Sequence, residues 1–245
     1  MSGKGTVLIV GAGDDIGAAV ARRFARGGYT VCAARRTAEK LEGLVTSIRD
    51  DGGSAYGFPL DARKEDQVKA IFRTIEDDIG PLDCVIFNPG ANVKYPIRET
   101  STKIFEKVWE LCCFAGFLCG REAADYMVPR GRGSIFFTGA TASMRGGSGY
   151  AAFSSGKFGL RALAQSMARE LGPQNIHVAH LVIDAGVDTK FVRALWEERG
   201  IDLKDAPEDT LMDPQSIGEA YYHLHHQSRD AWTFEMDLRP YGETW

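Results

Sequence analysis

Residues 6–17 have the sequence TVLIVGAGDDIG. The first five are apolar or β-branched, which predicts a buried strand, and the glycines that follow predict a tight turn that opens a helix. Glycines in such a turn allow backbone N–H groups to approach a pyrophosphate at the N-terminus of the helix. We therefore expect a strand–turn–helix unit that binds a dinucleotide, with Gly11, Gly13, Ile16 and Gly17 at the cofactor.

Two acidic residues, Asp14 and Asp15, stand inside this turn. Their carboxylates would repel a phosphate unless they point to solvent or cap the helix, and aspartate is a frequent helix cap. We expect both to act in helix capping.

Seven β-rich runs alternate with longer amphipathic stretches along the chain. The runs are Thr6–Val10, Thr30–Ala34, Ser54–Phe58, Leu82–Phe87, Gly133–Thr138, His177–Val182 and Thr233–Leu238. Alternation of strands and helices predicts a parallel sheet in a Rossmann-type α/β fold. At 245 residues, 44% hydrophobic and 25% charged, the chain is expected to be globular and to form a single domain over residues 1–245.

One segment, residues 188–214, breaks the alternation of strands and helices. It is either a lid over the ligand cleft or an ordinary connecting helix and loop. The aromatic-rich C-terminal stretch, Trp232–Trp245, either packs across a subunit boundary or folds back on its own chain.

The charge and hydropathy patterns argue against two kinds of partner. A formal net charge of -4 gives no excess of basic residues for nucleic acid or for an anionic membrane surface. No apolar run approaches the roughly 20 residues that a membrane helix needs. Met1–Gly5 leads directly into the first strand and leaves no room for a signal peptide, so we expect a cytoplasmic protein.

Cysteine and histidine positions do not indicate a metal site. The five cysteines, Cys32, Cys84, Cys112, Cys113 and Cys119, lack C-x-x-C spacing, and we expect buried thiols. Three of the five histidines fall within Tyr222–His226, where a solvated helix face is favoured over a metal cluster. We assign no metal.

The end of the second strand bears on the choice of cofactor. A fold that prefers NAD(H) usually carries an acidic residue there for the ribose 2′-hydroxyl, but this chain has Arg35 and Arg36. The two arginines either hold a 2′-phosphate or are simply solvated, and the first alternative favours NADP(H) over NAD(H). Asp61, Asn88 and Gly90 follow the third and fourth strands, where a ligand of such a sheet lies.

These motifs resemble those of the short-chain dehydrogenase/reductase family over essentially the whole chain. The similar segments are the turn Gly11–Gly17, the N-N-A-G-like Asn88–Ala91, the fourth-helix segment Phe105–Leu118, the Y-x-x-x-K-like Tyr150–Lys157 and the P-G-x-x-x-T-like Asp184–Thr189. The resemblance implies a doubly wound sheet of seven parallel strands, NAD(P)-dependent hydride transfer on carbonyls or alcohols, and a homodimer or homotetramer. It also places Val187 and Thr189 at the cofactor.

The chain departs from this family pattern at the catalytic positions. Phe153 stands where the family has tyrosine, Ala140 where it has serine and Cys112 where it has asparagine, so only Lys157 is retained. Phenylalanine cannot supply the proton that a ketone needs during reduction, and a well-placed acid contributes about 10²- to 10⁴-fold in rate. Lys157 can still bind the nicotinamide ribose hydroxyls.

Two nearby residues have alternative roles. Tyr150 is seven residues from Lys157, about 10.5 Å of helical rise, so it either reaches the substrate from another angle or packs against the adjacent loop. Cys112 is either a redox thiol or, with no obvious cationic neighbour, an inert packing residue.

Two functions are compatible with the sequence. The first is an NADPH-dependent reductase of a small molecule that needs no tyrosine, such as an imine, an activated C=C bond or a carbonyl, bound in an apolar pocket lined by Phe153, Ala140 and Cys112. The second is a catalytically silent dinucleotide-binding sensor or scaffold.

Overall fold

The computed structural model describes residues 4–198, 200 and 207–243. Their seven strands form one parallel sheet in the order β3-β2-β1-β4-β5-β6-β7. The strands are β1 (Thr6–Val10), β2 (Thr30–Arg35), β3 (Ser54–Pro59), β4 (Leu82–Phe87), β5 (Gly133–Thr138), β6 (Ile176–Ile183) and β7 (Glu235–Leu238). The predicted doubly wound Rossmann-type sheet of seven parallel strands is confirmed, with boundaries that differ by one or two residues. The strand order reverses between β1 and β4, and ligands of such sheets bind beyond the carboxyl ends of the strands at this point.

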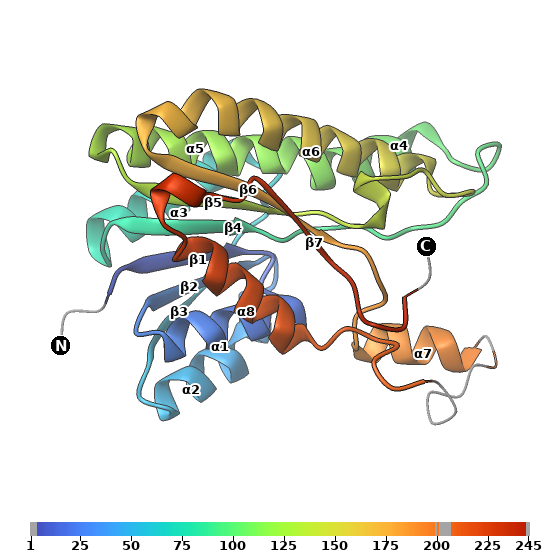
Figure 1. The fold of residues 1–245 in the computed structure, drawn as a ribbon, viewed down its shortest axis with the longest axis horizontal. Coiled ribbons are helices and arrows are strands. Elements are labelled where there is room, and N and C mark those ends of the chain that lie inside the picture. The colour runs from blue at the N-terminus through green and yellow to red at the C-terminus, as the bar shows by residue number, and fades with distance from the viewer. Residues whose placement is uncertain (1–3, 199, 201–206, 244–245) are drawn as a thin grey trace.

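Helices cover both faces of the sheet. They are α1 (Ile16–Arg26), α2 (Glu42–Asp50), α3 (Glu65–Asp78), α4 (Thr102–Trp109), α5 (Ala115–Arg130), α6 (Ala151–Leu171), α7 (Lys190–Glu198) and α8 (Pro214–His225), with a π-helical turn, Glu110–Phe114, between α4 and α5. Figure 1 shows α5 and α6 along one face and α1, α2 and α8 along the other, whereas α7 lies apart from both layers.

The central strand β1 divides the core into two parts. All five of its residues are buried, which is why its sequence is a continuous apolar run rather than an alternating one. Val7 and Ile9 pack with α1, α2 and α8, while Leu8 and Val10 pack with α3, α5 and α6. The two faces of β1 therefore fix the helices that flank the glycine-rich turn.

The expectation that the acidic pair caps α1 is wrong. Asp15 precedes the helix, but its side chain accepts no capping hydrogen bond, and Asp14 pairs with Arg35 instead. The N–H of Ala18, the group that a cap would satisfy, donates to the carbonyl of Gly13 at 2.9 Å. The turn's own backbone has replaced the side-chain cap.

The expectation of a solvated histidine face on α8 is wrong for His225. Its Nδ1 lies 3.0 Å from the Ser134 hydroxyl and its Nε2 lies 3.1 Å from the Tyr29 hydroxyl. Burial lowers the pKa of His225 to about 4. His223 and His226 are exposed, and no group of three metal-ligating side chains occurs among the described residues.

The other sequence expectations concern thiols, the tail and membrane helices. All five cysteines are buried free thiols, as expected.

Trp232 folds back on its own chain, where its ring stacks on His177 with centroids 4.9 Å apart, while Thr244 and Trp245 lie outside the described residues. Within the described part of the chain, no helix combines the length and the apolarity needed to cross a bilayer.

Candidate active site

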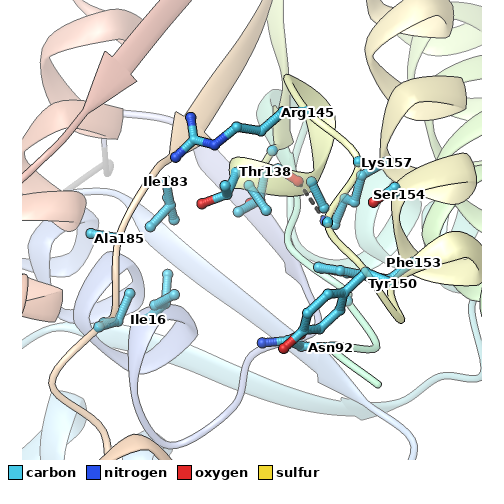
Figure 2. A pocket seen from close by; sticks show the side chains of 18 of the residues that line it. Ile16, Asn92, Thr138, Arg145, Tyr150, Phe153, Ser154, Lys157, Ile183 and Ala185 are labelled. Atoms are coloured by element: carbon cyan, nitrogen blue, oxygen red, sulfur yellow. Dashed lines mark hydrogen bonds between the residues drawn. The ribbon is translucent and has the colours of Figure 1, made fainter. Parts of the chain in front are cut away.

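Two cavities open beyond the carboxyl ends of the strands. The larger, of about 560 Å³, extends over the ends of β5 and β6 and the start of α6, and Figure 2 shows side chains that line it. The smaller, of about 470 Å³, extends over the ends of β1, β2 and β3. Asn88 and Gly90 line both cavities, so the two meet at the end of β4.

The glycine-rich turn has the close approach that its sequence predicts. Gly11 adopts a φ of +77°, in the left-handed region that favours glycine. A Cβ at Gly17 would lie 2.6 Å from the Cα of Ala12, whereas a Cβ at Gly13 would meet nothing within 4 Å. Gly17 thus lets the helix pack against the turn, Gly13 presents open backbone to the smaller cavity, and Ile16 lines the larger one.

The smaller cavity is positively charged at the end of β2. Arg35 and Arg36 both line it, together with Lys40, which the sequence analysis did not identify. Arg35 Nη1 donates to Asp14 Oδ1 at 2.9 Å, so only part of its donor capacity faces the cavity. Lys40 could have been found from its position in the sequence, because it is a basic residue in the turn Ala38–Leu41 that follows Arg36 and β2.

Asp61 also lines this cavity. Its carboxylate accepts from Arg63 Nε at 2.8 Å and from Arg63 Nη2 at 2.7 Å. These hydrogen bonds keep the pKa of Asp61 below its ordinary value. Asp61 is therefore ionised and held in place at neutral pH.

Asn88 connects three strands at the junction of the two cavities. Its Nδ2 donates to the Gly11 carbonyl at 3.1 Å, and its Oδ1 accepts from the Thr138 hydroxyl at 3.0 Å. Thr138 Oγ1 in turn lies 2.7 Å from the buried hydroxyl of Tyr221 on α8. This chain of hydrogen bonds fixes the turn, the end of β4 and the end of β5 relative to one another.

Lys157 is the buried cation of the larger cavity. Its side chain comes from α6 and is only 2% exposed. Nζ donates to the carbonyl of Thr138 at 2.7 Å and to that of Pro89 at 3.1 Å. Burial lowers the pKa of this ammonium, and the two carbonyl acceptors anchor it at the floor of the site.

An apolar ring stands next to this ammonium. Phe153 lines the larger cavity, and its ring centroid is 6.0 Å from Lys157 Nζ. Ala140 lines the same cavity, and its backbone N–H donates to the Ser143 hydroxyl at 3.1 Å. In the part of the chain that the structure describes, neither residue offers the cavity a side-chain proton donor.

The structure separates Cys112 from the cavity. Cys112 is fully buried in the apolar cluster that includes Phe153 and is not among the described residues that line the cavity. The expectation of no cationic neighbour is wrong, because the charge of Lys157 acts on this thiol. Burial nevertheless outweighs that charge and raises the pKa of Cys112, which favours the packing role over the redox role.

Tyr150 lies at the start of α6. Its ring packs with the apolar cluster around Phe153, and Lys94 Nζ is 5.8 Å from its centroid. Tyr150 and Asn92 both line the larger cavity (Figure 2), and Asn92 was missed by the sequence analysis. The tyrosine therefore both packs and faces the cavity.

The chain after β6 forms the remaining wall. Val187 lines the larger cavity and forms a parallel bridge with Met212. Thr189 directly precedes α7, and its Oγ1 accepts from the N–H of Val192 at 3.0 Å. It is not among the described residues that line either cavity. Of the predicted segment 188–214, residues 199 and 201–206 lie outside the described residues.

Arg145 is a further lining residue that the sequence analysis missed. It belongs to the loop between β5 and α6, and both of its terminal nitrogens donate to Asp184, at 3.1 and 3.2 Å. Sequence spacing alone does not bring these residues together, because Asp184 lies beyond α6, directly after the next strand, β6.

Comparisons with known proteins agree with this architecture. Residues 5–200 match the family model described as short chain dehydrogenase. A short-chain dehydrogenase from Rhodopseudomonas palustris is 51% identical, with a TM-score of 0.82 over 97% of this chain and 99% of that chain. The 2,3-dihydro-2,3-dihydroxybenzoate dehydrogenase of Bacillus subtilis strain 168 is 30% identical over 191 residues, covering 78% of this chain and 73% of that protein. A metagenomic short-chain oxidoreductase in complex with NADP is 23% identical and shares the fold, with a TM-score of 0.81 over 97% of each chain. The chain therefore belongs to the short chain dehydrogenase family of oxidoreductases.

Proposed function

We propose that this protein is an NADP(H)-dependent oxidoreductase with an atypical active site, which reduces a small organic molecule such as an imine, an activated C=C bond or a carbonyl. The observation that carries the proposal is the pairing of a retained, buried Lys157 with the apolar ring of Phe153 beside it. A chain that had lost the cofactor would have no need to bury a lysine at this cost.

The cofactor proposal rests on how well the two joined cavities fit a dinucleotide. The open backbone at Gly13 and the close contact at Gly17 suit a pyrophosphate, and Arg36 and Lys40 suit a 2′-phosphate in the smaller cavity. NADP is the ligand in the metagenomic relative. We therefore favour NADP(H) over NAD(H), with Arg35 in a lesser role because Asp14 engages it.

The cofactor-binding proposal extends to residues along the whole crevice. It comprises Gly11, Gly13, Ile16, Gly17, Arg35, Arg36, Asp61, Asn88, Gly90, Lys157, Val187 and Thr189. Thr189 is not among the described residues that line either cavity, so its proposed role is to fix the N-terminal end of α7 through its hydrogen bond from Val192.

The catalytic proposal is that three of the family's four catalytic groups are missing here, at Phe153, Ala140 and Cys112. When bound, the nicotinamide supplies a hydride. Lys157 holds a positive charge at the floor of the larger cavity, and Phe153 and Ala140 keep the neighbouring wall apolar. With no proton donor at position 153, a favoured substrate either carries its own proton, as an iminium does, or takes one from water.

The proposal also covers the organisation of the chain. We propose a single domain over residues 1–245, with segment 188–214 as a substrate lid that carries α7. The bridge between Val187 and Met212 supports a hinge at the base of that lid.

A homodimer or homotetramer is the assembly that we propose. Five large aromatic side chains on α4, the π-helical turn, α5 and α6 are each between 36% and 42% exposed: Phe105, Trp109, Phe114, Phe117 and Phe158. Trp109 stacks on Phe114, with ring centroids 6.4 Å apart. An apolar face of this kind is typical of a subunit interface.

The test is a titration of the purified protein with NADPH and NADH, followed by nicotinamide fluorescence. Tighter binding of NADPH supports the cofactor proposal, and oxidation of bound NADPH by a panel of imines, enones and carbonyls supports the enzyme. Failure to bind either nucleotide refutes the reductase.

The alternative function is a catalytically silent NADP(H)-binding sensor or scaffold. The absence of a side-chain proton donor at both Phe153 and Ala140 favours it. Tight NADPH binding without oxidation by any member of the panel would support this alternative.

A further inference from the structure

The larger cavity has a strongly asymmetric charge. Most of its wall is apolar, with Ile16, Phe153, Ile183 and Val187 among the lining side chains. The basic side chains in its described lining are Arg145 and Lys157, and that lining contains no aspartate or glutamate. A ligand with a negative charge therefore meets two basic side chains at the surface of the cavity, while the carboxylate that pairs with Arg145, that of Asp184, is only 1% exposed.

The two cations differ in what they can still bind. Lys157 is almost completely buried and donates to two backbone carbonyls. Arg145 is 49% exposed at its side chain and donates to Asp184 through two nitrogens. Of the five N–H groups of a guanidinium, two are used in this way and three remain for a ligand.

The Asp184 carboxylate accepts a hydrogen bond from a second arginine besides Arg145. The Asp184 carboxylate is 1% exposed and also accepts from Arg239 Nε at 2.9 Å. A side-chain hydrogen bond from Thr141 further favours its ionised form and lowers its pKa, against the effect of burial. Asp184 is thus a buried anchor that orients the planar guanidinium, and a preoriented guanidinium loses less conformational entropy when it binds.

We propose that Arg145 binds a carboxylate of the substrate, so that the substrate class is small organic acids. The inference rests on the proposed function and deepens it by naming the substrate class. Arg145 presents a planar fork of N–H groups, which matches a carboxylate and gives charge-assisted hydrogen bonds. Figure 2 shows Arg145 at the top of the view and Phe153 and Tyr150 lower down. All three line the same cavity, whose apolar wall can take the uncharged part of the molecule.

The test compares two probes of the same shape and different charge, cyclohexanecarboxylate and cyclohexanecarboxamide. Their binding is measured by calorimetry, with and without saturating NADPH. A charge-assisted hydrogen bond in a partly buried site is worth about tenfold or more in affinity, so the wild-type protein should prefer the carboxylate by at least about tenfold. Arg145→Gln should reduce the preference to about onefold.

Two further variants sharpen the test. Arg145→Lys keeps the positive charge and loses the fork, and should retain only part of the preference. Arg121→Gln is the matched control, since Arg121 is also a partly exposed arginine in an ion pair, with Glu65, but lies outside the described lining of the cavity. It should leave the preference unchanged.

The outcomes separate this inference from the proposed function. Equal binding of the two probes to the wild type, or an unchanged preference in Arg145→Gln, overturns the role of Arg145 even when NADPH binds. If Arg145→Gln does not fold, an unchanged preference in Arg145→Lys overturns it. An Arg145-dependent preference in a protein that never binds NADPH upholds the carboxylate site and refutes the reductase.

Discussion

Introducing hydroxyl groups at positions 153 and 140 should create a carbonyl reductase. Phe153→Tyr adds a phenol to a ring that already lines the larger cavity beside Lys157, and Ala140→Ser adds a second hydroxyl to the same wall. The nearby ammonium lowers the pKa of the new phenol and favours proton transfer to the developing alkoxide. A positioned acid contributes about 10²- to 10⁴-fold in rate, which is ~3 to 5 kcal/mol of activation free energy.

The assay is the oxidation of NADPH by a panel of aldehydes and ketones at pH 7. The double variant should exceed the wild-type kcat/KM by about 10²-fold or more. Phe158→Tyr is the matched control, because Phe158 is on the same helix but is 42% exposed and outside the described cavity lining. A double variant that binds NADPH as tightly as the wild type and reduces no carbonyl would refute the idea that the frame lacks only its acid.

Four other perturbations have defined outcomes. Lys157→Met removes the donor to the Thr138 and Pro89 carbonyls and should weaken NADPH binding by about tenfold in a fluorescence titration, with unchanged affinity counting against a cofactor role. Arg36→Gln combined with Lys40→Gln should weaken NADPH binding by at least about tenfold and leave NADH binding unchanged, and an equal loss for both nucleotides would contradict the 2′-phosphate assignment. Phe117→Glu places a charge on the exposed aromatic face and should make the protein monomeric in light scattering where the wild type forms the proposed oligomer, and an unchanged mass would contradict an interface at this face. The folded-state pKa of His225, about 4, lies below its ordinary value of 6.5, so its contribution to stability is complete above pH 6.5 and is lost as the pH falls through 4, by about 3 kcal/mol. His225→Gln should reduce the slope of the free energy of unfolding against pH over that range in urea titrations, with the part that His180 contributes retained, and an unchanged slope would contradict this.

The sequence predicted the features that local rules control. The apolar run before Gly11 gave the central strand, and the glycines gave the turn, because strand burial and close backbone approach leave a direct mark on residue type. The positions of Phe153 and Lys157, one helical turn apart, likewise explain why ring and ammonium are neighbours.

The features that the sequence did not predict depend on contacts between distant segments. Asp14 was expected to cap a helix but pairs with Arg35, because the carbonyl of Gly13 takes the helix N–H that a cap would use. His225 was expected in solvent but lies between the hydroxyls of Tyr29, just before β2, and Ser134 of β5, which no local pattern reveals. Arg145 was missed because its partner, Asp184, is 39 residues away.

The bridge between Val187 and Met212 has a consequence for how this chain can change. The N–H of Asp188 donates to the Met212 carbonyl and the N–H of Met212 donates to the Gly186 carbonyl, each at 2.9 Å. Backbone hydrogen bonds therefore join the two ends of the intervening segment at the bridge. The entropic cost of closing a loop grows only slowly with its length. Residues can therefore be added or removed between the two bridged ends with a small change in the stability of the fold. Under the lid proposal, replacing positions 188–211 with a different segment should therefore change the substrate preference and leave NADPH binding unchanged.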